Sequence, residues 1–258
     1  MIQTVLIPVE LCEYVLKHKL SKPFQLYMLL KSICYGQMKI DKQFHKLLAA
    51  RLGLKCEKTI KNNLKILHDL NFIGHNPNSG YYFIRGFDWV QSKLKLTART
   101  GAEFDYADID KLQAFCMAAV TCFIVKQQKR KWLSEQDKGC SNHDNHLSSA
   151  FYVSSTLLRD KLGISLNTAY RLKKKAHEAG FLEIIPNWEP LYQEARFKRS
   201  YLRGWPENKN ILRVRDGMLF LQRSDQIIPN VRFKRRKKIE TLIRGNYKGG
   251  QDLVLCIF

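Results

Sequence analysis

The most informative part of this chain of 258 residues is the stretch LLRDKLGISLNTAYRLKKKAHEAGFLEII, residues 157–185. Three leucines recur at helical spacing before Gly163, which permits a helix to end (Leu157, Leu158 and Leu162). Ser165 is a good N-cap for a second helix, which Gly180 ends. The apolar run at 181–185 then predicts a strand. The stretch therefore predicts two helices that are joined by a tight turn and followed by a strand.

An earlier stretch, LLAARLGLKCEKTIKNNLKILHDLNFI at residues 47–73, repeats this order. The offset between the copies is 110 residues up to the glycine of the turn and 109 after it. Gly53 ends the first helix of this copy. The second helix is expected to begin near Cys56 or Glu57, where a good capping residue is missing. One more apolar helix is expected upstream of each copy, near residues 24–35 and 109–128. A duplicated plan of this kind predicts two domains of similar architecture.

A β-hairpin is expected after the second helix of each copy. In the first copy, apolar runs at 72–74 and 81–85 flank a polar turn. In the second copy, the strand at 181–185 leads out, and residues 211–215 are expected to return. The long insert between these two strands is rich in basic and aromatic side chains.

These patterns predict a mainly helical α+β fold of two tandem domains with β-hairpins. We expect the first domain at residues 1–100 and the second, with its long insert, at 101–230. Residues 231–258 are expected to form a basic C-terminal arm, because six of the seven residues at 232–238 are Lys or Arg. The apolar run at 252–258 predicts a strand-like end that returns to a core or to a partner chain. A disordered, solvated tail is the alternative for the arm.

The charge of the chain favours a polyanionic partner. The sequence holds 44 Lys and Arg against 23 Asp and Glu, a formal net charge of +21. Residues 1–100 carry 16 basic and 6 acidic side chains, residues 101–190 carry 12 and 11, and residues 191–258 carry 16 and 6. Self-repulsion on this scale opposes folding unless an anion offsets it. The surplus of basic side chains in the first and last thirds of the chain predicts two separate contact surfaces. The alternative is a basic protein that has no polyanionic partner.

Membrane insertion and secretion are not expected. The longest apolar run, residues 114–125, is twelve residues long, and a bilayer span needs about 20. The first residues lack the basic region of a signal peptide. The seven cysteines include no Cys-x-x-Cys pair, which suits reduced thiols better than a disulfide framework. We therefore expect a cytoplasmic protein.

The order of three helices and a hairpin resembles the winged helix-turn-helix superfamily. The segments that carry the resemblance are residues 52–73 and 162–182. The second is the closer match, because the run SLNTAYR from Ser165 is similar to the start of the recognition helix in bacterial regulators of this fold. The first departs from the pattern, since Asn62 stands where Arg171 stands in the second. Two such units on a basic chain are also similar to plasmid replication initiators, whose paired winged helices bind repeats at an origin.

This resemblance implies that the second helix of each copy enters the major groove of duplex DNA. It implies contacts from Arg171 to guanine and from Asn62 and Asn167 to adenine. Thr59 and Thr168 would meet a phosphate or a thymine methyl group. The other expected contacts near the two helices and in the first hairpin are Lys58, Lys61, Lys65, Ser165, Lys174, Lys175, Asn78, Tyr81 and Arg85. Phosphate contacts are expected from the insert and the arm, through Lys198, Arg199, Arg232, Lys234, Arg235 and Arg236. The alternatives are a solvated surface for any single lysine and a carboxylate partner for Arg171.

The sequence does not favour catalysis or a bound cofactor. Cys140, His143 and His146 have a spacing that a metal could use, but they lie in a polar loop without the ligands that would complete a zinc site. We therefore expect no metal there. Phosphate-binding loops and common hydrolase motifs are absent. Four carboxylates could bind a metal in a nuclease (Glu103, Asp105, Asp108 and Asp110), although acids that precede a helix are the simpler interpretation.

We therefore expect sequence-specific binding of double-stranded DNA, with no catalysis and no cofactor. The expected role is replication initiation of a plasmid or mobile element, or transcription regulation. A homodimer is left open by the sequence. The first alternative is a protein-interaction scaffold built on winged helices. The second is a metal-dependent nucleic-acid-processing enzyme that uses the acidic cluster.

Overall fold

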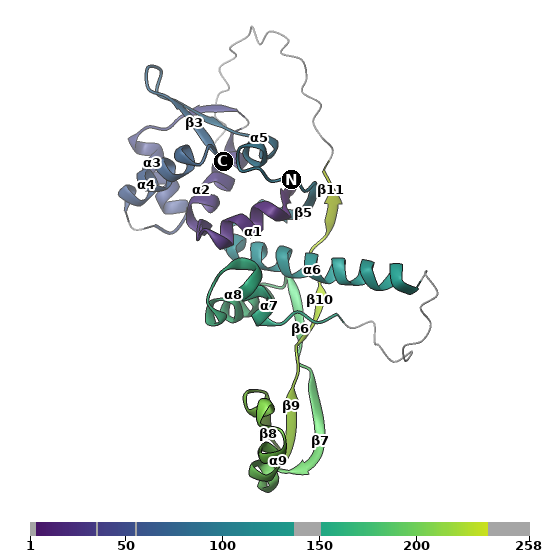
Figure 1. Cartoon of the computed structure of the whole chain (residues 1–258). Helices are drawn as coiled ribbons and strands as arrows, with labels where there is room; N and C mark the ends of the chain where they lie inside the picture. The colour runs from purple at the N-terminus through teal and green to yellow at the C-terminus, as the bar shows by residue number, and fades with distance from the viewer. Residues whose placement is uncertain (1–3, 35, 55, 137–150, 237–258) are drawn as a thin grey trace.

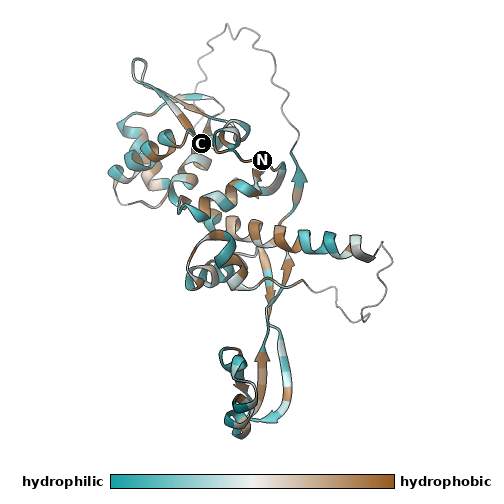
Figure 2. Ribbon diagram, in the orientation of Figure 1, coloured by the Kyte–Doolittle hydropathy of each residue, from teal (hydrophilic) through white to brown (hydrophobic). Residues whose placement is uncertain are grey.

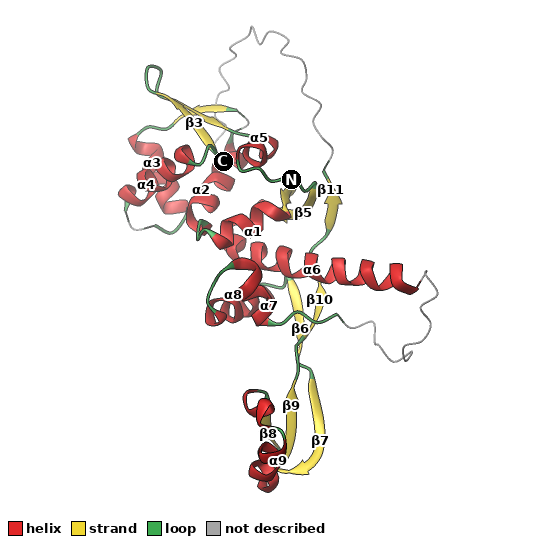
Figure 3. Cartoon of the chain, viewed as in Figure 1, coloured by secondary structure: helices red, strands yellow, loops and turns green. Residues whose placement is uncertain are grey.

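The computed structural model describes residues 4–34, 36–54, 56–136 and 151–236, and the fold of these residues is α+β. Helices and short strands alternate along the chain, and the described strands form small antiparallel sheets (Figure 1, Figure 3). Two groups of elements share the same order. An insert extends from the second group, and a further sheet joins segments from both ends of the described chain.

The first unit, residues 21–84, contains three helices and a three-stranded sheet. Its helices are α2 (Ser21–Ile33), α3 (Lys42–Arg51) and α4 (Glu57–Asp69). Its strands β2 (Gln37–Lys39), β3 (Ile73–Asn76) and β4 (Tyr81–Ile84) pair in the order β2-β4-β3. Gly53 follows α3 with φ +61°, a left-handed conformation that favours glycine. The hairpin predicted for the first copy is confirmed, with a strand in front of α3 that the sequence did not reveal.

The second unit has the same order of elements. It contains α6 (Leu112–Gln136), α7 (Ser155–Leu162), α8 (Leu166–Glu178), β6 (Leu182–Ile185) and β10 (Gln226–Pro229). β6 pairs antiparallel with β10, and Tyr152 forms an isolated bridge to Gln226 at the other edge of β10. Gly163 ends α7 with φ +61°, as Gly53 does in the first unit. The bridge at Tyr152 thus stands where β2 stands in the first unit.

The return strand of the second hairpin is not the one that the sequence indicated. β8 (Leu212–Arg215) pairs with β9 (Met218–Gln222), and β9 pairs in turn with β7 (Trp188–Glu194). The prediction that residues 211–215 return against β6 is therefore wrong, because β10 takes that place. The insert, residues 186–225, is a separate sheet with its own small core (Leu212, Leu219 and Leu221), and it extends away from the rest of the chain (Figure 1). Its helical segments are η2 (Ala195–Phe197), α9 (Lys198–Gly204) and η3 (Pro206–Asn210).

A fourth sheet in the described chain brings the first and last described segments together. β5 (Thr100–Asp105) lies between β1 (Thr4–Pro8) and β11 (Phe233–Arg235). Residues 231–236, the start of the predicted basic C-terminal arm, pack on the body of the protein. The rest of the predicted arm, residues 237–258, lies outside the described residues, and so does its strand-like end. The elements beside this sheet are α1 (Val9–Lys17), α5 (Phe87–Lys93) and η1 (Tyr106–Lys111).

One hydrophobic core joins both units around α6. The buried part of α6 contacts α1 on one side and α8 on the other. The Phe115 ring of α6 lies 4.7 Å from Phe104 of β5 and 5.4 Å from Phe181, which precedes β6, between ring centroids. Figure 2 shows the apolar colouring of this part of α6 and the polar colouring of its far end. The two units are therefore held together by packing as well as by the chain that connects them.

A buried ion pair fixes α8 to the segment that enters β10. Only 2% of the Lys173 side chain is exposed, and its Nζ donates to Asp225 Oδ2 at 2.7 Å. The same Nζ donates to the backbone oxygen of Val153 at 3.1 Å. The equivalent position in the first unit is Leu64, which packs in the core. A buried ammonium is tolerated only where such partners replace its water, so Lys173 ties together three segments of the second unit.

Replacing Asp225 with Ala should lower the free energy of unfolding by about 3 kcal/mol, because the Lys173 ammonium is left buried without its counter-charge. Urea unfolding followed by circular dichroism measures this loss. Glu189→Ala is the matched control, because Glu189 pairs with Arg223 at 2.6 Å on the surface. This exposed pair should contribute less than about 1 kcal/mol. Equal losses in the two variants would contradict the structural role of Lys173.

Candidate nucleic-acid interface

The outer face of α4 is basic and exposed. Its inner face is buried through Ile60, Asn63, Leu64 and Leu67. Lys58, Lys61, Asn62 and Lys65 are exposed, and Thr59 is half-buried. In the part of the chain that the structure describes, none of the three lysines forms an ion pair. The sequence therefore placed these side chains on the correct side of the helix.

On α8 the predicted residues divide into a cap and an open face. The Ser165 Oγ accepts from the Thr168 backbone N–H at 3.2 Å and lies 2.8 Å from the Thr168 hydroxyl. Both hydroxyls therefore serve the start of the helix. Asn167 and Arg171 are exposed, and within the described ranges the Arg171 guanidinium has no carboxylate partner. Two more basic positions follow on the same helix: Lys175 is exposed, and Lys174 lies 3.6 Å from Glu178 in an exposed pair.

The hairpin of the first unit presents two of its three predicted contacts. Asn78 and Tyr81 are exposed. Arg85 instead lies over the rings of Phe83 and Trp89, at 5.9 and 5.0 Å from their centroids. Its backbone oxygen also accepts from the buried Tyr27 hydroxyl at 2.7 Å. Arg85 thus packs the base of the hairpin.

The cations of the insert and of β11 differ in what they contact. Lys198 and Arg199 are exposed at the start of α9, and Arg232 and Arg235 are exposed around β11. Lys234 pairs with Glu103 of β5 at 3.1 Å. Arg236 pairs with Asp88 of α5 at 2.8 Å, hydrogen bonds to Gln91 and lies over the Phe87 ring. Lys234 and Arg236 therefore help to hold β11 in place, a role that the charge pattern did not reveal.

A hollow of about 360 Å³ lies between α3, α4 and the hairpin of the first unit. We call it the histidine hollow, because its polar lining is His45, Lys61, Lys65, His68, His75 and Tyr82. His45 Nε2 is buried, with no hydrogen-bond partner in the described structure. Burial and the nearby Lys61 lower the pKa of His45, which keeps it neutral at pH 7. The sequence does not reveal the hollow, because its three histidines are far apart in the chain.

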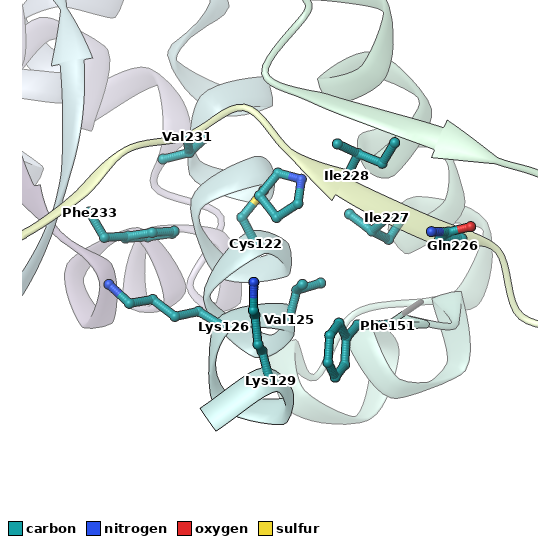
Figure 4. A pocket seen from close by; sticks show the side chains of 11 residues that line it. Cys122, Val125, Lys126, Lys129, Phe151, Gln226, Ile227, Ile228, Val231 and Phe233 are labelled. Atoms are coloured by element: carbon teal, nitrogen blue, oxygen red, sulfur yellow. The ribbon is translucent and has the colours of Figure 1, made fainter. Parts of the chain in front are cut away.

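A second hollow, the apolar groove, lies between α6 and the strands β10 and β11 (Figure 4). Its volume is about 370 Å³, and Val125, Phe151 and Ile228 contribute to its apolar lining. Lys126 and Lys129 stand at its edge (Figure 4). Burial raises the pKa of the Cys122 thiol to about 12, so this thiol stays protonated and unreactive.

The acidic cluster has structural partners. Asp105 caps η1 by accepting from the Ala107 N–H, and Asp108 pairs with Lys111 at 2.9 Å. Glu103 pairs with Lys234, and Asp110 accepts from Gln25 at 3.4 Å. Over residues 4–136 and 151–236, apart from two single-residue gaps, no three His, Cys, Asp or Glu side chains are placed to hold a metal ion. The loop with Cys140, His143 and His146 lies outside the described residues.

No helix in the described part of the chain is both long enough and apolar enough to cross a bilayer. The five described cysteines are free thiols (Cys12, Cys34, Cys56, Cys116 and Cys122). Comparison of the chain with protein-family models, with curated proteins and with solved structures found no match.

The starts of α4 and α8 should differ in stability because their caps differ. Ser165→Ala should cost about 1 kcal/mol, since the Thr168 N–H loses its acceptor. At the equivalent place in the first unit, the Cys56 sulfur accepts from the Lys58 N–H at 3.3 Å. Cys56→Ser should stabilise the protein by about 0.5 kcal/mol, because a hydroxyl oxygen is the better acceptor. Urea unfolding of both variants measures the difference, and a loss of stability in Cys56→Ser would refute the assignment of that cap.

Proposed function

We propose that the chain binds double-stranded DNA through two winged helix-turn-helix units. The sheet order β2-β4-β3 and its counterpart Tyr152-β10-β6 support this assignment. In front of the second helix, β2 pairs with the return strand β4 in the first unit, and the single bridge at Tyr152 contacts the return strand β10 in the second, which fits the winged-helix arrangement. α4 and α8 take the place of the recognition helices, and the insert extends the wing of the second unit.

The observation that carries the proposal is the exposed outer face of the third helix in each unit. Arg171 and Asn167 are exposed on α8, and Asn62 occupies the equivalent position to Arg171 on α4. A guanidinium and a carboxamide can each form paired hydrogen bonds with the edge of a purine in the major groove. The lysines of α4, which form no ion pair within the described residues, suit phosphates, which position a protein on DNA without reading its sequence.

The shared core supports tandem binding by the two units. α1 contacts α6 and α7, and Lys161 of α7 pairs with Glu13 of α1 at 3.0 Å. α4 and α8 both lie on the left of Figure 1. A fixed relation between two recognition helices suits two half-sites about 10 bp apart on one face of a duplex. A protein of this kind acts at an origin, as a replication initiator of a plasmid or mobile element, or at an operator, as a transcription regulator.

Fluorescence anisotropy with duplexes at rising salt tests this function. If six to ten phosphates are neutralised, the affinity should fall by about 10³- to 10⁵-fold between 50 and 200 mM salt. A protein-interaction scaffold would show no salt-sensitive binding. Selection of bound sequences from a random duplex pool should then yield two half-sites, and a single half-site would leave the first unit without a role in reading bases.

Arg171→Ala should relax the selected sequence at one base pair, with a loss of about 1–3 kcal/mol for the preferred base. Arg130→Ala is the charge-matched control, because Arg130 is exposed towards the far end of α6. It should leave the preference unchanged. An equal loss of affinity on every sequence would show that Arg171 contacts only phosphate.

A further inference from the structure

The histidine hollow gathers nitrogen-bearing side chains from three elements of the first unit. His45 comes from α3, Lys61, Lys65 and His68 come from α4, and His75 comes from β3. No carboxylate belongs to its lining. The hollow lies beside the exposed face of α4, between that helix and the hairpin, where the backbone of a duplex bound by α4 would pass.

The lining suits an anion better than a metal ion. Three imidazoles could suggest a metal site, but in the described residues they are not arranged to share one ion. The ammonium groups of Lys61 and Lys65 would also repel a cation. A phosphate oxygen, in contrast, accepts hydrogen bonds from ammonium, imidazolium and hydroxyl groups. Burial raises the pKa of Tyr82, so its hydroxyl stays protonated and can donate.

We propose that the histidine hollow binds a backbone phosphate of duplex DNA and that His45 takes up a proton when the phosphate enters. This inference rests on the proposed DNA-binding function and adds a specific anion site to it. His75 lies stacked on Tyr82, with ring centroids 4.4 Å apart, which orders one wall of the site. The buried Nε2 of His45, which has no partner in the described structure, gains an acceptor when the phosphate is present.

The direction of the pH dependence follows from the charges that surround His45. Asp41 stands at the start of α3, the helix that carries His45. Glu57, Lys61, Lys65 and His68 face His45 from α4. The hairpin adds His75 and Tyr82. In the free protein, burial and Lys61 outweigh Asp41 and Glu57, so the pKa of His45 is lowered. A phosphate supplies the missing negative charge and raises that pKa, so the complex holds more protons and binding strengthens as the pH falls.

Anisotropy titrations at constant ionic strength test the site. The affinity of the full chain for a duplex should rise by about tenfold from pH 8 to pH 6, as the uptake of one proton allows. His45→Gln cannot take up this proton and should lose most of the rise. His18→Gln is the matched control, because His18 ends α1 against Tyr14 outside the hollow. If His45→Gln keeps the full pH dependence, the proposal is wrong.

A titration of the unmodified protein avoids dependence on a variant that folds poorly. The His45 ring signal, followed by NMR, should titrate at a higher pH when duplex is added. Inorganic phosphate provides a second probe. A shift with inorganic phosphate but not with duplex would overturn the DNA assignment and leave a free-phosphate site. Salt-sensitive duplex binding without any shift of His45 would retain the proposed function and overturn the site.

Discussion

The packing of α6 is the constraint on which the rest of the structure depends. This helix begins the second unit, yet its buried side chains also contact α1 and the region of β5. Because close-packed interiors resist sliding, the two units cannot turn independently without opening the core around Phe115. The exposed faces of α4 and α8 therefore keep a fixed orientation relative to each other. The insert has a separate core, so this packing does not hold it in place.

The basic side chains fall into two groups: some pair with carboxylates within the fold, and others have no carboxylate partner among the described residues. Lys173, Lys234 and Arg236 each meet a carboxylate within the fold. The lysines on the outer face of α4, and Arg171 on α8, have no carboxylate partner among the described residues. Repulsion between these free cations is spread over two helices and weakens the free protein. A bound polyanion would relieve this repulsion, so the same residues that limit stability can supply binding energy.

Local signals in the sequence predicted much of the fold. Gly53 and Gly163 ended helices, Ser165 capped one, and the first hairpin had a clear polar turn. Pairings between distant segments were less accessible. Residues 211–215 and 226–229 both contain apolar residues that suit a strand, and the choice between them depends on the insert's own core around Leu219. The histidine hollow was missed for the same reason, since helical spacing does not show which histidines meet across α3, α4 and β3.

The pairing of β11 with β5 has a consequence for the newly made protein. β5 can form its ladder with β1 as soon as both have left the ribosome, but its other edge must wait for a strand that is synthesised well over a hundred residues later. During that interval the nascent chain displays an open strand edge, to which another polypeptide could add. A pause in synthesis before β11 would prolong the exposure of this edge.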